Sequence, residues 1–109
     1  MFHARLVQYT LGTGQRLIAE RLTKELDKES RSLMGFRGNV YFFDDSSGEY
    51  RVVNYWDTKE DAEAAHKVIS PKLEEVLQKY TSEKPTYRFF EIFDVIDDGD
   101  IIASHTITK

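Results

Sequence analysis

Residues 34–71 read MGFRGNVYFFDDSSGEYRVVNYWDTKEDAEAAHKVISP, and this stretch decides the fold. After a glycine-bracketed turn it continues as an apolar strand over residues 40–43. The segment DDSSG at 44–48 reverses the chain into a second strand, residues 50–56, because aspartate, serine and glycine favour turns. That strand ends on the only tryptophan and leads directly into a helix that carries His66. The stretch therefore predicts a strand pair whose end places a large aromatic ring beside an imidazole.

The rest of the chain supplies the elements on either side of this hairpin. Alternating and helical patterns predict a strand at residues 2–10, a helix from residue 15 to about residue 33, a long strand at 86–96 and a short tail strand at about 100–108. The order is β-α-β-β-α-β plus a tail strand. This is the ferredoxin-like α+β arrangement, an antiparallel sheet with two helices on one face. We expect a single domain over residues 1–109.

Two details of the second helix follow from its sequence. The side chain of Thr58 or of Asp57 can cap the first free amide groups. Pro71 removes an amide donor, and its ring clashes with the preceding turn. We therefore expect two helical pieces, with Ser70 capping the second.

Apolar side chains fall on both faces of the expected sheet. The last long strand puts Phe90 on one face and Phe89 on the other, and the second strand divides Phe42 from Phe43 in the same way. Two helices cover only one face, so the other would expose an apolar patch larger than a monomer usually tolerates. We expect a two-fold homodimer in which the sheets of two copies pack face to face. The alternative is a monomer in which one face lines a ligand cavity.

Composition and charge limit the classes of partner. The formal charge is −4, which argues against nucleic acid and anionic membranes because both require a positive surface. No cysteine is present, so disulfides, thiolate nucleophiles and cysteine-ligated metals are excluded. His3, His66 and His105 are too scattered to predict a metal site. The apolar runs, about four residues at most, are far shorter than the roughly twenty that span a bilayer, and no signal peptide is recognisable, so we expect a cytoplasmic protein.

The candidate catalytic residues are His66, Asn54 and Trp56. His66 borders the apolar stripe of the second helix, and its ordinary pKa near neutrality suits a general base, a proton shuttle or a haem ligand. It equally suits a boundary histidine bonded to backbone or water. Asn54 lies inside a strand, where asparagine is depleted, and its amide could donate to a phenolate or peroxide oxygen. The flat indole of Trp56 suits stacking on a planar aromatic molecule and equally suits a plain core position.

Four further residues are candidates for binding the substrate: Tyr9, Phe42, Arg51 and Ile69. We expect Tyr9 and Arg51 to reach the same cavity as Trp56, although both suit the protein surface equally well. Phe42 and Ile69 would add apolar contacts to the substrate.

Several short motifs carry a resemblance to a known family. They are Gly35-Phe36-Arg37-Gly38 after the first helix, Trp56-Asp57-Thr58-Lys59-Glu60 at the strand-to-helix junction, and Ala65-His66 followed by Ser70-Pro71 in the second helix. With this element order, nearly the whole chain resembles the antibiotic biosynthesis monooxygenase superfamily of dimeric α+β barrels. The resemblance implies a cofactor-free oxygenase that acts on polycyclic aromatic phenols or quinols, or a haem-degrading monooxygenase. It also implies a substrate cavity between the sheet and the helices, near Trp56.

The sequence departs from the pattern of the haem-degrading relatives. Those proteins use an asparagine on the first strand, and a tryptophan and a later histidine on the second helix. Here the first strand contains no asparagine, and Glu75 stands near the position of the haem-ligating histidine. Our first hypothesis is therefore a cofactor-free monooxygenase acting on a planar aromatic molecule. A haem-binding or haem-degrading protein with His66 as the ligand is the second, and a non-enzymatic dimeric ligand-binding module is the third.

Overall fold

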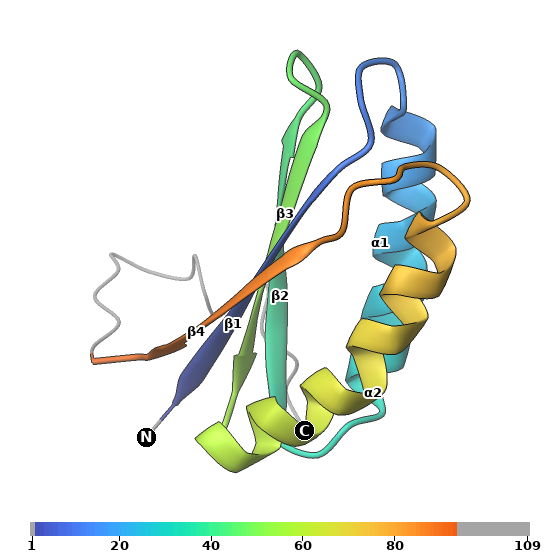
Figure 1. Cartoon of the computed structure of the whole chain (residues 1–109). Coiled ribbons are helices and arrows are strands. Elements are labelled where there is room, and N and C mark those ends of the chain that lie inside the picture. The colour runs from blue at the N-terminus through green and yellow to red at the C-terminus, as the bar shows by residue number, and fades with distance from the viewer. Residues whose placement is uncertain (1, 94–109) are drawn as a thin grey trace.

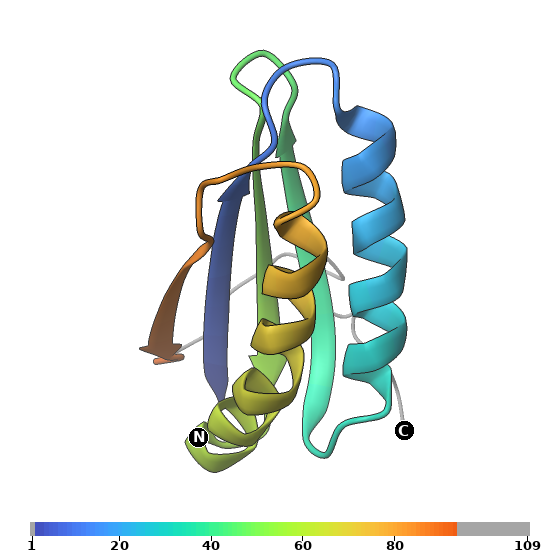
Figure 2. The ribbon, with the colours of Figure 1, turned by 45° about the vertical axis from the view of Figure 1, so that its right-hand side comes forward.

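The computed structural model describes residues 2–93 of the chain. Within that range it contains the elements β1 (His3–Thr10), α1 (Arg16–Arg31), β2 (Phe36–Asp44), β3 (Glu49–Trp56), α2 (Lys59–Leu77) and β4 (Thr86–Glu91). The strands pair in the order β2-β3-β1-β4, and every pair is antiparallel. Both helices cover the same face of the sheet (Figures 1 and 2). The ferredoxin-like α+β prediction is confirmed. The last described strand, β4, ends at Glu91, earlier than the predicted end at residue 96. Residues 94–96 and the predicted tail strand at about 100–108 lie outside the described residues.

The pairing of the two central strands determines which side chains meet beneath the helices. The pairs on this face are Arg5 with Asn54, Val7 with Val52, and Tyr9 with Tyr50. The apolar pairs pack against residues of both helices and form the larger core cluster. A second cluster forms near the start of α2 and consists of Phe36, Trp56, Ala62, Ala65 and Ile69. The polar pair Arg5–Asn54 lies between these two apolar regions in the register.

The turn between β2 and β3 forms where its sequence predicts it. Asp44 accepts hydrogen bonds from the amide and the hydroxyl of Ser46, as turn-forming aspartates do. Gly48 has a φ of +72°, and a Cβ there would overlap the backbone of Gly12. Glycine is therefore required at position 48 by both conformation and space.

The second helix is continuous, so the prediction of two helical pieces was wrong. Thr58 caps its start by accepting the amide of Asp61 at 3.0 Å, but Ser70 caps nothing and instead donates to the carbonyl of His66 at 2.7 Å. Pro71 lies on the exposed side of the helix, where water can replace the missing hydrogen bond. The helix bends partway along its length instead of ending (Figures 1 and 2), which is the usual consequence of an internal proline.

The face of the sheet away from the helices is polar towards the β2–β3 turn and apolar at the other end. From the turn, its rows across the sheet are Phe42, Arg51, Gln8 and Thr86, then Val40, Val53, Leu6 and Arg88, then Gly38, Tyr55, Ala4 and Phe90. We call the apolar part the open-face patch, made of Ala4, Leu6, Val40, Val53, Tyr55 and Phe90.

No helix within residues 2–93 is long and apolar enough to cross a membrane.

Candidate functional site

The centre of the candidate site is the guanidinium of Arg5 on β1. Its side chain is only 1% exposed. Nε donates to Nδ1 of His66 at 3.0 Å, and Nη1 donates to Oδ1 of Asn54 at 3.5 Å. The same Oδ1 accepts the indole N–H of Trp56 at 3.0 Å. The three predicted catalytic residues are thus joined through a fourth residue, Arg5, that the sequence reasoning did not select. We call these four residues the Arg5 cluster.

Adjacent elements bring the Arg5 cluster together. Arg5 and Asn54 are register partners on the two central strands. Trp56 is the last residue of β3, and α2 begins three residues later. His66 lies two helical turns into α2, on the side that contacts β1. The short connection between β3 and α2 therefore fixes the imidazole over the polar pair of the sheet.

Aromatic rings enclose the imidazole of His66 on the β4 side. The ring centroids of Tyr87 and Phe89 lie 4.6 and 5.2 Å from it, and both rings meet it edge-on at 81°. The ring of Tyr87 also lies 5.3 Å from the guanidinium of Arg5, and its hydroxyl donates to Glu74 at 2.9 Å. Phe89 is 40% exposed. These rings offer a partly exposed apolar surface next to the polar groups.

The charges at the site are set by burial. Burial lowers the pKa of Arg5 to about 10, so this residue is still a cation at pH 7. Burial, and then the charge of Arg5, lower the pKa of His66 below its ordinary value. Neutral imidazole carries one proton, and Nδ1 accepts the hydrogen bond from Arg5, so the proton is on Nε2. His66 therefore presents an N–H donor at Nε2, where a general base would need a lone pair.

We expect His66 to make folding stability depend on pH. The folded protein favours the neutral imidazole, while the unfolded chain takes up a proton near pH 6.5. The stabilisation is therefore present above about pH 6.5 and is lost as the pH falls through that value towards the lower folded pKa. Urea unfolding between about pH 7.5 and 5.5 should show a steeper loss of stability in the wild type than in His66→Gln. Lys67→Gln, at an exposed neighbour, should keep the wild-type slope, and equal slopes in wild type and His66→Gln would contradict the assignment.

Three of the predicted residues on the helix side are core residues. Trp56 is 0% exposed and meets Phe36 edge-on with ring centroids 5.4 Å apart, so its indole is not free to stack on a ligand. Ile69 is 2% exposed and packs in the same apolar cluster. Tyr9 also faces the helices, but it stacks on Tyr50 at 5.8 Å in the other core cluster. The contact that Trp56 makes at the site is the hydrogen bond from its indole N–H to Asn54.

The other two predicted substrate-binding residues lie on the opposite face of the sheet. Phe42 and Arg51 are register partners on the side without helices, and Phe42 is 50% exposed. The thickness of the sheet separates them from His66. A cavity beneath the helices would therefore not include Phe42 or Arg51. For these two residues, only binding of a ligand or partner on the helix-free side remains a prediction.

The donor set of the Arg5 cluster does not fit axial haem ligation. A ligating histidine offers the lone pair of one ring nitrogen and holds its proton on the other. In His66 the lone pair of Nδ1 is directed at Arg5, and Nε2 carries the proton. A haem iron would have to displace the guanidinium or force the other tautomer beside a buried cation. Residues 2–93 also contain no group of three or more histidine and acidic side chains that could hold a metal ion.

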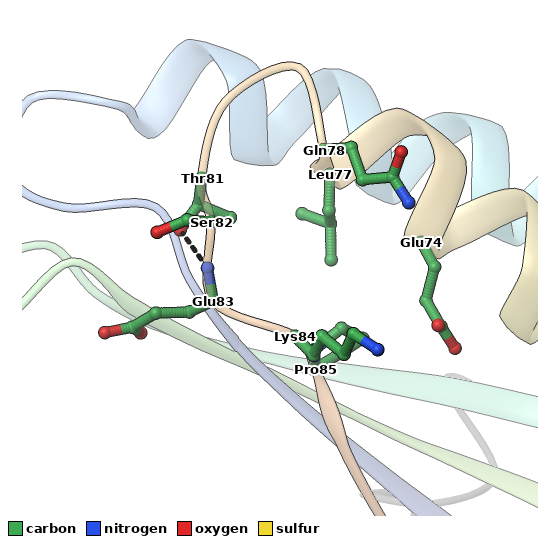
Figure 3. Close-up of a pocket in the computed structure, with 8 residues that line it drawn as sticks. All are labelled: Glu74, Leu77, Gln78, Thr81, Ser82, Glu83, Lys84 and Pro85. Atoms are coloured by element: carbon green, nitrogen blue, oxygen red, sulfur yellow. Dashed lines mark hydrogen bonds between the residues drawn. The ribbon is translucent and has the colours of Figure 1, made fainter.

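A separate hollow of about 180 Å³ lies where the C-terminal end of α2 meets the loop before β4 (Figure 3). Its lining residues are Glu74, Leu77, Gln78, Thr81, Ser82, Glu83, Lys84 and Pro85. The amide of Glu83 donates to the hydroxyl of Thr81 at 3.1 Å, which holds the loop in place. The hollow meets the surroundings of the Arg5 cluster at Glu74, the partner of Tyr87. It is smaller than the roughly 300 Å³ at which ligand pockets begin, so we do not assign a polycyclic ligand to it.

Solved structures with the same fold include two oxygenases from Streptomyces. One is the monooxygenase ActVA-Orf6 of Streptomyces coelicolor, solved in complex with the ligand nanaomycin D, with a TM-score of 0.71, 16% identity, and coverage of 89% of this chain and 92% of that chain. The other is SnoaB of Streptomyces nogalater, a cofactor-independent oxygenase, with a TM-score of 0.71, 10% identity, and coverage of 89% and 98%. A protein of unknown function from Nitrosomonas europaea gives a TM-score of 0.73 at 13% identity, with coverage of 90% and 95%.

These comparisons show a shared fold. No protein-family model matches the chain, and no curated protein matches it. The chain has the fold of antibiotic biosynthesis monooxygenase-type proteins, as its sequence motifs predicted. Each comparison covers most of this chain and most of the compared chain, so the similarity extends over the sheet and both helices.

Proposed function

We propose that this chain is a cofactor-independent monooxygenase that acts on a planar aromatic small molecule. The observation that carries the proposal is the Arg5 cluster, a buried polar group beneath the helices of a fold that cofactor-independent oxygenases also use. Buried polar side chains in an otherwise apolar core are costly, and a catalytic role can offset that cost. Stabilising charge that develops on a substrate oxygen is such a role.

Each residue of the Arg5 cluster has a different role in this proposal. Asn54 and His66 supply N–H donors, and Arg5 fixes the His66 tautomer whose donor is Nε2. Trp56 positions Asn54. The aromatic surface for a flat substrate comes from Tyr87 and Phe89, which are partly exposed, and not from the buried indole. This arrangement assigns His66 the role of a hydrogen-bond donor to an oxygen anion in place of the general base expected from its pKa.

A methylene group flanked by aromatic rings is the reacting group that this chemistry suits. Loss of a proton to water gives an enolate, whose oxygen the donors stabilise. The anion gives one electron to O₂, the two radicals join as a C–O–O⁻ group, and the protonated hydroperoxide loses water to leave a carbonyl. One CH₂ and one O₂ thus become one C=O and one H₂O, and the substrate supplies all the electrons. No added cofactor is needed for this balance.

The test is oxygen uptake with 1,8-dihydroxy-9-anthrone, a planar phenol that carries such a methylene. With a chelator present and no added metal or flavin, the wild type should consume one O₂ per anthrone and form the anthraquinone. Asn54→Ala and His66→Gln should each lower kcat about a hundredfold, as loss of one oxyanion donor does. Lys67→Gln, on the exposed side of the same helix, is the matched control and should leave the rate unchanged.

The uncatalysed oxidation of the anthrone sets the baseline. An oxidation rate with the wild type no faster than with heat-denatured protein would contradict the proposal for this substrate class. Binding of the anthrone without oxygen uptake would instead support a non-enzymatic ligand-binding module.

We further propose that the chain works as a two-fold homodimer through the open-face patch. Val53 and Leu6 lie at its centre as neighbours on the two middle strands. Phe90 at its edge is 40% exposed. A second copy would cover these apolar side chains and leave the helix-covered face for the ligand.

A further inference from the structure

Two buried polar atoms near the start of β1 have no hydrogen-bond partner within residues 2–93. They are Nη2 of Arg5 and Nδ1 of His3. Residues 3 and 5 point to the same face of a strand, so both atoms lie beneath the helices. Within the rigid guanidinium fork, Nη2 is adjacent to Nε, which donates to His66. A pair of unused N–H bonds is therefore buried directly beside the imidazole.

Arg5 is also a buried cation whose described partners are neutral. They are an imidazole nitrogen, an amide oxygen and the ring of Tyr87. Glu74, a nearby carboxylate, is engaged by the Tyr87 hydroxyl. The ion pairs found within residues 2–93 are on the surface and use Arg16, Arg31, Arg37 and Lys72. A buried charge without a countercharge is unfavourable, and an anion at Nη2 would supply both the charge and the missing hydrogen bonds.

We propose that Arg5 binds the acidic oxygen of the substrate as an anion, so that the site takes planar phenols and enolisable aryl ketones in their ionised form. This rests on the proposed function in one respect, namely that the Arg5 cluster is the substrate site. Nη2 supplies the charge and the hydrogen bonds to the oxygen, while the rings of Tyr87 and Phe89 contact the flat body of the ligand. The proton lost by the ligand goes to water, and no bond other than O–H or C–H is broken.

The test uses 1,8-dihydroxyanthraquinone, whose absorption moves to longer wavelength when a phenolic hydroxyl ionises. Its ring system is already fully oxidised, so oxygen chemistry does not enter the measurement. The pKa of the probe should fall by about one to three units when it binds to the wild type, as for an acid next to a buried cation. Arg5→Gln should abolish most of this change, so that the variant binds the ionised probe at least tenfold more weakly. Arg5→Lys should retain part of it, because the charge remains while the fork is lost.

Arg21→Gln is the matched control, since it removes an exposed arginine on α1 and should leave the probe's pKa change at its wild-type size. Circular dichroism establishes that each variant is folded before titration. The inference is overturned if the wild type does not bind the probe, if binding leaves or raises its pKa, or if folded Arg5→Gln lowers it as much as the wild type. Its failure is separate from failure of the oxygenase proposal. Anthrone oxidation could persist without a change in probe pKa, and the pKa change could occur in a protein that consumes no oxygen.

Discussion

Trp56→Ala is expected to lower the free energy of unfolding by about 3–5 kcal/mol, the cost typical of removing a large buried aromatic side chain. The side chain is 0% exposed and fills the cluster made with Phe36, Ala62, Ala65 and Ile69. Its indole N–H also donates to Oδ1 of Asn54. In Trp56→Ala this buried oxygen would lose one of its hydrogen-bond donors. An ordinary domain is stable by about 5–15 kcal/mol, so this one change removes a large part of the total.

Urea unfolding followed by circular dichroism measures this effect, at one fixed protein concentration because association would also contribute to stability. Tyr80→Ala is the matched control, since it removes a large aromatic ring that is 41% exposed in the turn after α2. It should cost less than about 1 kcal/mol. A similarly small loss in Trp56→Ala would contradict the packing described for this cluster. Because Trp56→Ala changes stability so strongly, Trp56→Phe is the better variant for testing the role of the indole N–H in activity.

Val53→Asp is expected to prevent formation of the proposed homodimer. Val53 is central in the open-face patch, with Val40 on one side and Leu6 on the other. Two-fold symmetry would place the new carboxylate twice in the same interface, each time between two apolar side chains. Burying a charge there costs several kcal/mol, so we expect the dissociation constant to rise by about a thousandfold or more.

Sedimentation velocity at about 10 µM distinguishes the two states. The wild type should sediment as a dimer and Val53→Asp as a folded monomer. Val68→Asp makes the same substitution at a valine that is 38% exposed on α2, outside the patch, and should remain a dimer. A monomeric wild type, or a dimeric Val53→Asp variant, would contradict the proposal that the open-face patch is a dimer interface.

Local patterns were sufficient for the fold within residues 2–93. The strand predicted at residues 2–10 corresponds to β1, in which Val7 and Tyr9 lie on one face and Leu6 on the other, because side chains alternate along a strand. The turn at 44–48 and the Thr58 cap also formed as expected. The continuity of α2 was not foreseen, because the effect of Pro71 depends on whether it faces water or the core. That depends on how the helix packs on the sheet, which local sequence does not state.

The site was only partly visible in the sequence. Asn54 and His66 stood out as polar residues on apolar elements, and the structure places both in contact with Arg5. Arg5 was overlooked because arginine is usually exposed. A signal was nevertheless present, since Arg5 shares a strand face with the core residue Val7. Arg51 was expected to reach the same cavity as Trp56, but it lies on the face opposite to Asn54, three residues later, because side chains alternate along the strand.

The most direct test of the central claim is the protonation state of the His66 ring at pH 7. Long-range ¹⁵N–¹H NMR correlation on the uniformly labelled full chain distinguishes the two ring nitrogens, and His66→Gln assigns the signals. We predict a neutral ring with the proton on Nε2 and an unprotonated Nδ1, because Arg5 donates to Nδ1 at 3.0 Å. A proton on Nδ1, in either the other neutral tautomer or the imidazolium, would contradict the arrangement on which the proposed site depends.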